Sequence, residues 1–156
     1  PFMSESNVTA LLNSASLSTS SRVESVTPAM ETTARAFRWE SGPLFGSLEE
    51  RPIDTPAQFT DFVSDYLDRT RSHCNGDFAS SSTPVPTPQG IEQASSYEIA
   101  CVSPGGGSSA AVLFVARKGV FSVIANESSA EAIDTAIEAR DRIYAALSSL
   151  TRNPTE

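Results

Sequence analysis

Three side chains that could bind a metal ion lie within five residues of the sequence: His73, Cys74 and Asp77. A structural zinc site needs about three or four ligands, mostly thiolates and imidazoles. The whole chain holds one histidine and two cysteines, and no further ligand follows at a suitable spacing. We therefore expect no metal site and no cofactor.

Catalytic spacing is also missing from the sequence. A triad of serine, histidine and aspartate would have to use His73, since it is the only histidine, and the chain has no Gly-x-Ser-x-Gly motif to present a nucleophile. The glycine-rich run 104–107 lacks the Gly-Lys-Ser/Thr ending of a phosphate-binding loop and precedes an apolar strand rather than a helix. We predict no catalytic residue and expect a non-catalytic protein.

Cys74 and Cys101 are the only cysteines, and each lies beside an element that the pattern predicts to be ordered. We interpret them as a disulfide, which would stabilise the fold by roughly 3 to 4 kcal/mol through loop closure. Because disulfides persist in oxidising compartments, the pairing predicts a periplasmic or secreted protein. The alternative, two buried reduced thiols in a cytosolic protein, stays open.

The densest aromatic group is formed by Phe37, Trp39 and Phe45. Aromatic side chains near the rim of a sheet can form a ligand or partner surface, and we take these three as candidate binding residues. The hydrophobic core is the other place where such side chains are commonly found. As an alternative function we consider a small-molecule binder or minor hydrolase with a pocket near Trp39 and His73.

These residues have to be positioned by a domain that begins after a polar segment. Residues 1–33 are rich in serine and threonine and hold one apolar patch, Val8, Leu11 and Leu12, with helical spacing. We expect a short helix at about 7–13 and a flexible tether through about residue 30, because so polar a stretch buries little to offset its ordering entropy. A single domain is predicted over 34–150 and a frayed tail over 151–156.

Strand and helix patterns alternate along the predicted domain. The aromatic residues at 37 and 39 alternate with charged ones, and a break at 41–43 predicts a hairpin with 44–48. A capping pattern at 55–58 begins a helix with a buried stripe, made of Phe59, Phe62, Val63, Tyr66 and Leu67.

The second half of the domain is predicted to be mostly strands. A short strand at 77–80 precedes an exposed loop at 81–90, which contains three prolines. Strands then follow from Ser95 and at 110–116 and 120–125, before a last helix that begins at Ser128. The predicted class is α+β, an antiparallel sheet of five to six strands with two main helices packed on it.

The charge balance bears on partners and location. The net charge is −8 and no cluster of lysine and arginine occurs, so we expect no nucleic-acid partner. No apolar run approaches the roughly 18 to 20 residues that a membrane span needs. We expect an exported accessory domain, with any signal peptide removed, that binds a protein partner of the cell envelope.

Three segments carry a resemblance to a known family: the aromatic strand AFRWESG, the late hairpin VLFVARKGVFSVIA and the ending ARDRIYAALSSL. With the order of elements from Phe37 to Leu150, they resemble the PsbP and Mog1-like α/β sandwich proteins. The resemblance implies a central antiparallel sheet with a terminal helix, frequent export, and binding of partners without catalysis. It assigns no functional residue in this chain.

Overall fold

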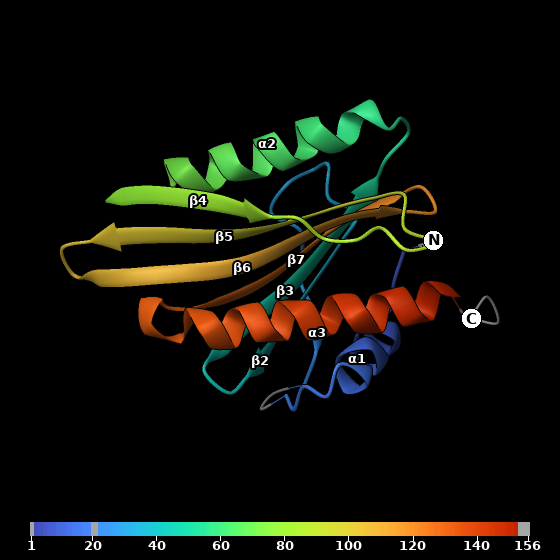
Figure 1. Ribbon diagram of the computed structural model, residues 1–156, viewed down its shortest axis with the longest axis horizontal. Helices are drawn as coiled ribbons and strands as arrows, with labels where there is room; N and C mark the ends of the chain where they lie inside the picture. The colour runs from blue at the N-terminus through green and yellow to red at the C-terminus, as the bar shows by residue number, and fades with distance from the viewer. Residues whose placement is uncertain (1, 20–21, 153–156) are drawn as a thin grey trace.

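Seven strands form a single antiparallel sheet in the computed structural model, which describes residues 2–19 and 22–152. Their order across the sheet is β1-β2-β3-β7-β6-β5-β4 (Figure 1). The strands are β1 (Glu24–Ser25), β2 (Arg35–Ser41), β3 (Leu44–Pro52), β4 (Asp77–Thr83), β5 (Gln93–Ser103), β6 (Gly106–Arg117) and β7 (Val120–Ser129).

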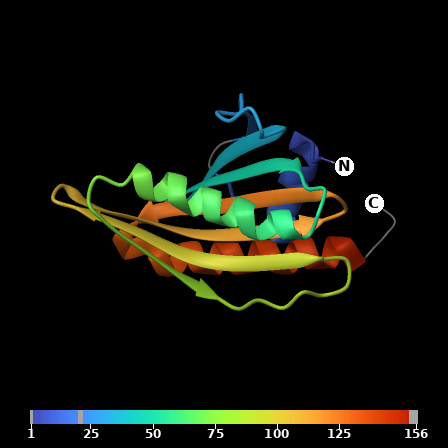
Figure 2. The same cartoon turned by 90° about the horizontal axis from the view of Figure 1, so that it is seen from above.

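Helices cover both faces of this sheet. The helices α1 (Glu5–Ser14) and α3 (Ile133–Arg152) pack on one face, and α2 (Ala57–Ser72) packs on the other (Figures 1 and 2). The predicted α+β class with an antiparallel sheet is confirmed, but five to six strands and two main helices were too few. The additional strand, β1, has two residues, which is too short to show an alternating pattern.

The N-terminal segment differs from the predicted flexible tether. The helix α1 lies where a short helix was expected, and its apolar side chains Val8, Leu11 and Leu12 are all buried in the core. Met3 and Val23, on either side of this helix, join the same cluster. Few apolar residues suffice to order the segment because Met3, Val8, Leu11, Leu12, Ala15 and Val23 are buried, and β1 adds backbone pairing with β2.

The alternation of residues along each strand divides the core into two layers. Phe37, Trp39 and Leu48 face α1 and α3, whereas Phe114 and Phe121 face α2. In the second layer Phe59 and Phe62 of α2 meet the Phe121 ring edge to face, at centroid distances of 5.5 and 5.2 Å. The predicted stripe of α2 therefore packs on β6 and β7.

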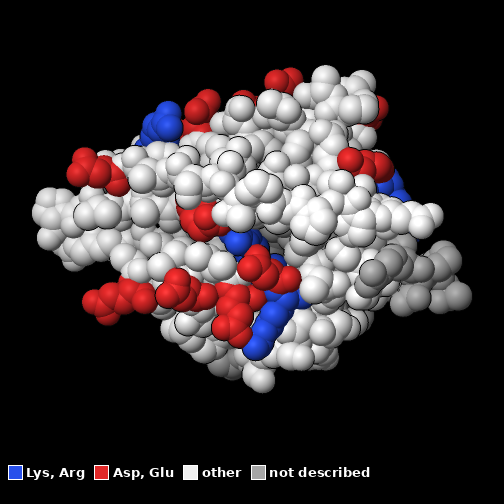
Figure 3. Space-filling view, in the orientation of Figure 1, with Lys and Arg blue, Asp and Glu red and all other residues white. Residues whose placement is uncertain are grey.

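A buried ion pair joins α3 to the sheet. The Arg140 side chain is buried, and its guanidinium contacts the Glu98 carboxylate of β5 and donates to the Tyr97 carbonyl. Thr83 of β4 also donates to the Glu98 carboxylate, at 2.9 Å. Elsewhere the acidic residues of α3 are exposed, and acidic side chains gather on that part of the molecule (Figure 3).

The predicted disulfide between Cys74 and Cys101 is present. It ties the residue just after α2 and its cap to β5, with a Cα–Cα distance of 5.8 Å. The backbone of Gly76 then packs closely against β5, because a Cβ atom at Gly76 would lie 2.0 Å from the Val102 carbonyl oxygen. The bridge and this contact hold the chain against β5 just before β4 begins at Asp77.

Several boundaries differ from the predicted ones because strand pairing extends into polar segments. The strand β4 continues to Thr83, β6 begins inside the glycine run 104–107, and β7 continues to Ser129. The last helix therefore begins at Ile133, after a 3-10 turn at Ala130–Ala132, and not at Ser128. It reaches Arg152, and residues 153–156 of the predicted tail lie outside the described residues.

Candidate binding groove

The helix α2 covers only part of its face of the sheet. It packs on β5, β6 and β7, which leaves the same face of β1, β2 and β3 without a helix (Figure 2). Alternate residues of β3 point to this open side: Phe45, Ser47, Glu49 and Arg51. Between α2 and β3 lies a groove with β7 as its floor, which we call the α2–β3 groove.

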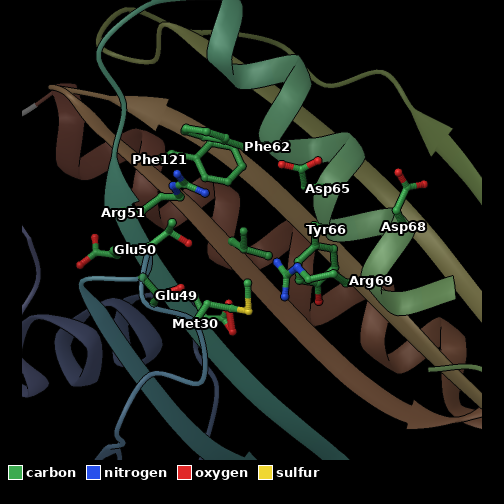
Figure 4. A pocket seen from close by; sticks show the side chains of 13 residues that line it. Met30, Glu49, Glu50, Arg51, Phe62, Asp65, Tyr66, Asp68, Arg69 and Phe121 are labelled. Carbon is green, nitrogen blue, oxygen red and sulfur yellow. The ribbon is translucent and has the colours of Figure 1, made fainter. Parts of the chain in front are cut away.

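The α2–β3 groove contains a cavity of about 380 Å³. Phe62 and Tyr66 of α2 and Phe121 of β7 give it an aromatic surface (Figure 4). Met30, which precedes β2, lies on the opposite wall with 40% of its surface exposed. The cavity is thus apolar inside and open to solvent, as expected of a recognition site.

Arg51 is the most unusual side chain in this cavity. Its guanidinium lies 3.6 Å from the centroid of the Phe62 ring, which is a cation–π contact (Figure 4). Its Nε atom is buried and has no hydrogen-bond partner, and Arg51 forms no ion pair within the described part of the chain. A buried donor without an acceptor costs free energy, roughly 1 to 3 kcal/mol. The position therefore offers a donor for an incoming acceptor.

A second arginine, Arg69, packs over the aromatic ring of Tyr66. The Arg69 guanidinium lies 5.6 Å from the centroid of Tyr66. Burial raises the pKa of the Tyr66 hydroxyl, and Glu49 and Glu127 raise it further, while Arg69 opposes the shift. Tyr66 therefore stays neutral at physiological pH and presents its hydroxyl as a donor or acceptor.

Acidic side chains share the rim with the two arginines. Glu49 of β3 and Asp65 and Asp68 of α2 line the cavity, and both aspartates are exposed. The lining therefore combines aromatic surface, arginine donors and carboxylate acceptors. Such a mixture is suited to a ligand with apolar, basic and hydrogen-bond-accepting groups.

The groove continues beyond this cavity along β3. A second hollow of about 410 Å³ is lined by Thr70 of α2, Cys101 of β5, Phe45 and Glu127, and a third of about 570 Å³ shares Phe45 and Glu127 with it. Phe45 is 60% exposed where the two meet. From Arg51 to Phe45 the groove is about 20 Å long, at ~3.3 Å per strand residue.

The three candidate binding residues do not form one surface. Phe37 and Trp39 are 2% and 3% exposed in the core beneath α1 and α3, and Phe45 lies on the opposite face in the α2–β3 groove. Strand pairing decides this arrangement. Trp39 lies opposite Gly46, and Phe45, the neighbour of Gly46 in β3, points to the other face of the sheet. Of the three, only Phe45 is exposed, although Trp39 lines the third hollow together with it.

Trp39 borders the third hollow, but His73 lines none of the three hollows described above. His73 caps the end of α2 on the other side of the sheet from Trp39, is exposed, and places its Nδ1 2.7 Å from the Arg69 carbonyl oxygen. No serine or carboxylate is recorded in contact with its ring among residues 2–19 and 22–152. His73 therefore serves as the C-cap residue of α2.

Sequence reasoning missed Arg51 and Met30, and it considered Glu49 only as one of a pair of acidic residues with Glu50. The helical stripe that supplies Phe62 and Tyr66 was predicted, but as core alone. Arg51 and Glu49 continue the alternation that Phe45 begins, so a longer β3 would have placed them beside Phe45. Nothing in the sequence indicated that Met30, in the expected tether, would face α2.

Residues 2–19 and 22–152 contain no group of three His, Cys, Asp or Glu side chains placed to hold a metal ion. Within the same ranges, no helix combines the length and the apolar character required to span a bilayer.

Comparison with known proteins gives a fold likeness. No family model matches the chain, and no curated protein matches it. The chain is similar to the crystal structure of a protein of unknown function from Pseudomonas aeruginosa, for which a regulatory role has been suggested. The TM-score is 0.51 at 14% identity, over 88% of this chain and 86% of that one. At this identity the likeness concerns the fold alone.

Proposed function

We propose that this chain is an exported, non-catalytic accessory domain that binds a protein partner in the α2–β3 groove. The observation that carries the proposal is Arg51, whose Nε is buried without an acceptor beside an aromatic, solvent-accessible cavity. Buried donors in native structures are nearly all paired with protein groups or ordered water, so the Arg51 Nε can donate to an acceptor that a partner brings into the cavity.

The lining favours a polypeptide with an apolar side chain and a basic residue. An apolar side chain would fill the surface between Phe62 and Met30, and its backbone carbonyl would accept from Arg51. Basic residues nearby would meet Glu49 and Asp65. The groove length of about 20 Å suits roughly six extended residues or three to four helical turns.

The disulfide supports the exported location. Cys74 and Cys101 are separated by 27 positions in the sequence, and structural disulfides of this kind are typical of periplasmic and secreted proteins. The resemblance of the sequence to the PsbP and Mog1-like proteins, which are often exported, motivates the same location. A binding role without catalysis is also consistent with the regulatory role suggested for the Pseudomonas aeruginosa protein.

Site-specific photo-crosslinking in the native host tests the proposal. A photoreactive residue at Met30 should give one reproducible crosslink to a protein, because Met30 is exposed on the groove wall. The matched control carries the same residue at Thr135, which is exposed on α3 on the other face of the sheet. Equal crosslinking from both positions, or none from Met30, would contradict a partner in the groove.

A binding measurement then connects the crosslink to Arg51. A synthetic peptide of the mapped partner segment should bind the Arg51→Met variant at least tenfold more weakly than the natural chain. The Arg142→Met variant is the control, because Arg142 is exposed on α3, on the other face of the sheet, and lines none of the three hollows of the groove. An equal loss of peptide affinity in both variants would indicate general charge attraction and not recognition by Arg51.

A small molecule is a second candidate ligand for the same cavity. Its volume of about 380 Å³ falls in the size range of small-molecule pockets, roughly 300 to 1,000 Å³. A fractionated metabolite extract that raises the melting temperature of the natural chain, and not of Arg51→Met, would favour this candidate. In that case the photo-crosslink at Met30 should be absent.

A further inference from the structure

The strand β4 forms one edge of the sheet, next to β5. It has seven residues, six of them exposed, and only Phe78 is partly buried. Each residue pairs with one residue of β5 from Asp77 opposite Val102 to Thr83 opposite Ser96, without a bulge. The backbone donors and acceptors on its outer side therefore form a regular, accessible row (Figures 1 and 2).

This edge carries none of the usual protections against strand addition. Natural sheets protect edges with short strands, lysine, proline, bulges or a covering segment. Within β4, Ala79 to Thr83 are uncharged, and the first proline, Pro84, comes after the strand has ended. The opposite edge, β1, has only two residues. The surface over β4 and β5 is also mostly free of charged side chains (Figure 3).

The edge is held rigidly in an extended form. The Cys74–Cys101 bridge and the Gly76 contact with the Val102 carbonyl position its first residues. At its other end Thr83 donates to Glu98, and Ser96 donates to the Thr83 carbonyl at 2.6 Å. An extended ligand that pairs with a rigid strand loses little free energy in ordering the receptor.

We infer that the outer edge of β4 binds an extended segment of a protein partner, which adds to the sheet as a further antiparallel strand. Backbone hydrogen bonds would supply most of the affinity, as in other cases of strand addition. The complementary segment carries an apolar β-branched residue opposite Phe78 and a basic residue opposite Asp77. Small hydroxyl side chains along Ser80, Ser81 and Ser82 leave room for residues of different sizes.

A second copy of the chain fits this edge less well. If two copies of β4 paired along their full length, Asp77 would lie opposite Thr83 and Phe78 opposite Ser82, so neither would meet a complementary residue. Each copy also carries a net charge of −8, which disfavours close approach of two copies. The proposed segment is therefore part of a different protein, and it does not depend on the α2–β3 groove being a binding site.

A designed peptide provides the probe. The acetylated and amidated peptide Thr-Val-Thr-Val-Thr-Val-Lys, laid antiparallel to β4, places its last valine opposite Phe78 and its lysine opposite Asp77. We expect saturable binding by NMR titration, with slower amide exchange in β4. Two further peptides are N-methylated on the three valines or on the three threonines. Only one set should lose binding, because alternate residues of a strand direct their N–H groups to the same side.

Protein variants identify the edge. Ser80→Lys/Ser82→Lys should bind the peptide at least fivefold more weakly, because lysine on an edge hinders strand addition. Thr135→Lys/Ala145→Lys makes the same charge change at exposed positions of α3 and should bind as the natural chain does. Unchanged melting temperatures would show that all variants fold. Equal affinity of the two N-methylated peptides, equal affinity of the two lysine variants, or no saturable binding would overturn the inference.

Discussion

The guanidinium of Arg51 stacks on the Phe62 ring, 3.6 Å from its centroid, while the Arg51 Nε atom has no hydrogen-bond partner. The strand β3 supplies the arginine and the helix α2 supplies the ring, so the pair forms only when the two elements meet across the groove. The stacking holds the guanidinium in place without satisfying its Nε donor. Such an arrangement keeps a donor oriented and available for a ligand.

Replacing this arginine should therefore cost little stability. Arg51→Met loses a cation–π contact of roughly 0.5 to 2 kcal/mol but also removes a buried unsatisfied donor. We expect the free energy of unfolding in urea to change by less than about 1 kcal/mol. A loss above about 3 kcal/mol, the size typical of a broken buried network, would instead assign Arg51 a structural role.

The disulfide should contribute a large share of the stability. In Cys74→Ser/Cys101→Ser, loss of the bridge should lower the free energy of unfolding by roughly 3 to 4 kcal/mol on the chain-entropy model. Urea denaturation of the variant and of the oxidised natural chain gives the difference. Reduced natural protein should behave as the variant does, and an effect near zero would contradict the entropic estimate.

Glu50 should make stability depend on pH. Burial raises the pKa of its carboxyl above the ordinary value of 4.5, although the Met3 N–H donates to it at 2.8 Å and opposes the shift. The folded state therefore binds the proton more tightly than the unfolded state, so the contribution of Glu50 is full below pH 4.5 and is lost as pH rises through the raised pKa.

Glu50→Gln isolates this contribution, since glutamine keeps an acceptor for Met3. The gain in stability of the variant over the natural chain should be small at low pH and should grow toward neutral pH. Urea denaturation at several pH values measures the difference. A difference that stays constant with pH would show that Glu50 is not responsible.

Gly46 should not tolerate a side chain. A Cβ atom there would lie 2.1 Å from the indole Nε1 of Trp39, so Gly46→Ala forces the buried ring to move. Overpacking of this kind costs roughly 1 to 3 kcal/mol. Gly105→Ala is the matched control, because nothing lies within 4 Å of its added Cβ. Thermal unfolding that leaves both variants equally stable would contradict the packing of Trp39 on Gly46.

The helix α1 should behave as part of the core. Leu11 is 2% exposed and packs with the cluster beneath α3, so Leu11→Ala should cost roughly 2 to 5 kcal/mol. Leu17→Ala should cost less, because Leu17 is only partly buried. If both substitutions had negligible effects on urea denaturation, the N-terminal segment would be the loosely attached tether that its composition suggested.

Much of the fold could be predicted because its signals are local. The stripe of α2, the early hairpin and the two apolar strands β6 and β7 are encoded within short windows of sequence. The segments that were mispredicted are polar. Ser128 lies in a strand because it pairs with Ser109 of β6, and Gly106 and Gly107 lie in a strand because they pair with Ser103 and Val102 across a tight hairpin. Strand pairing of this kind leaves no alternating apolar pattern in a polar segment.

The candidate groove could not be predicted for the same reason. Phe62 was recognised as apolar and Phe45 as aromatic, but their exposure depends on which part of the sheet α2 covers. Arg51 pairs with Phe121 across two strands that are 70 residues apart in sequence, and this register places the guanidinium under α2.

Local sequence patterns were enough to predict the α+β class, the position of most helices and strands, and the pairing of the only two cysteines. Packing of the whole chain places the apolar side of α1 in the core, buries Phe37 and Trp39 while leaving Phe45 exposed, and brings Arg51 against Phe62 in an open groove. Helix and strand periodicity arises from neighbours along the chain. Burial, grooves and free edges arise from the packing of elements that are far apart in sequence.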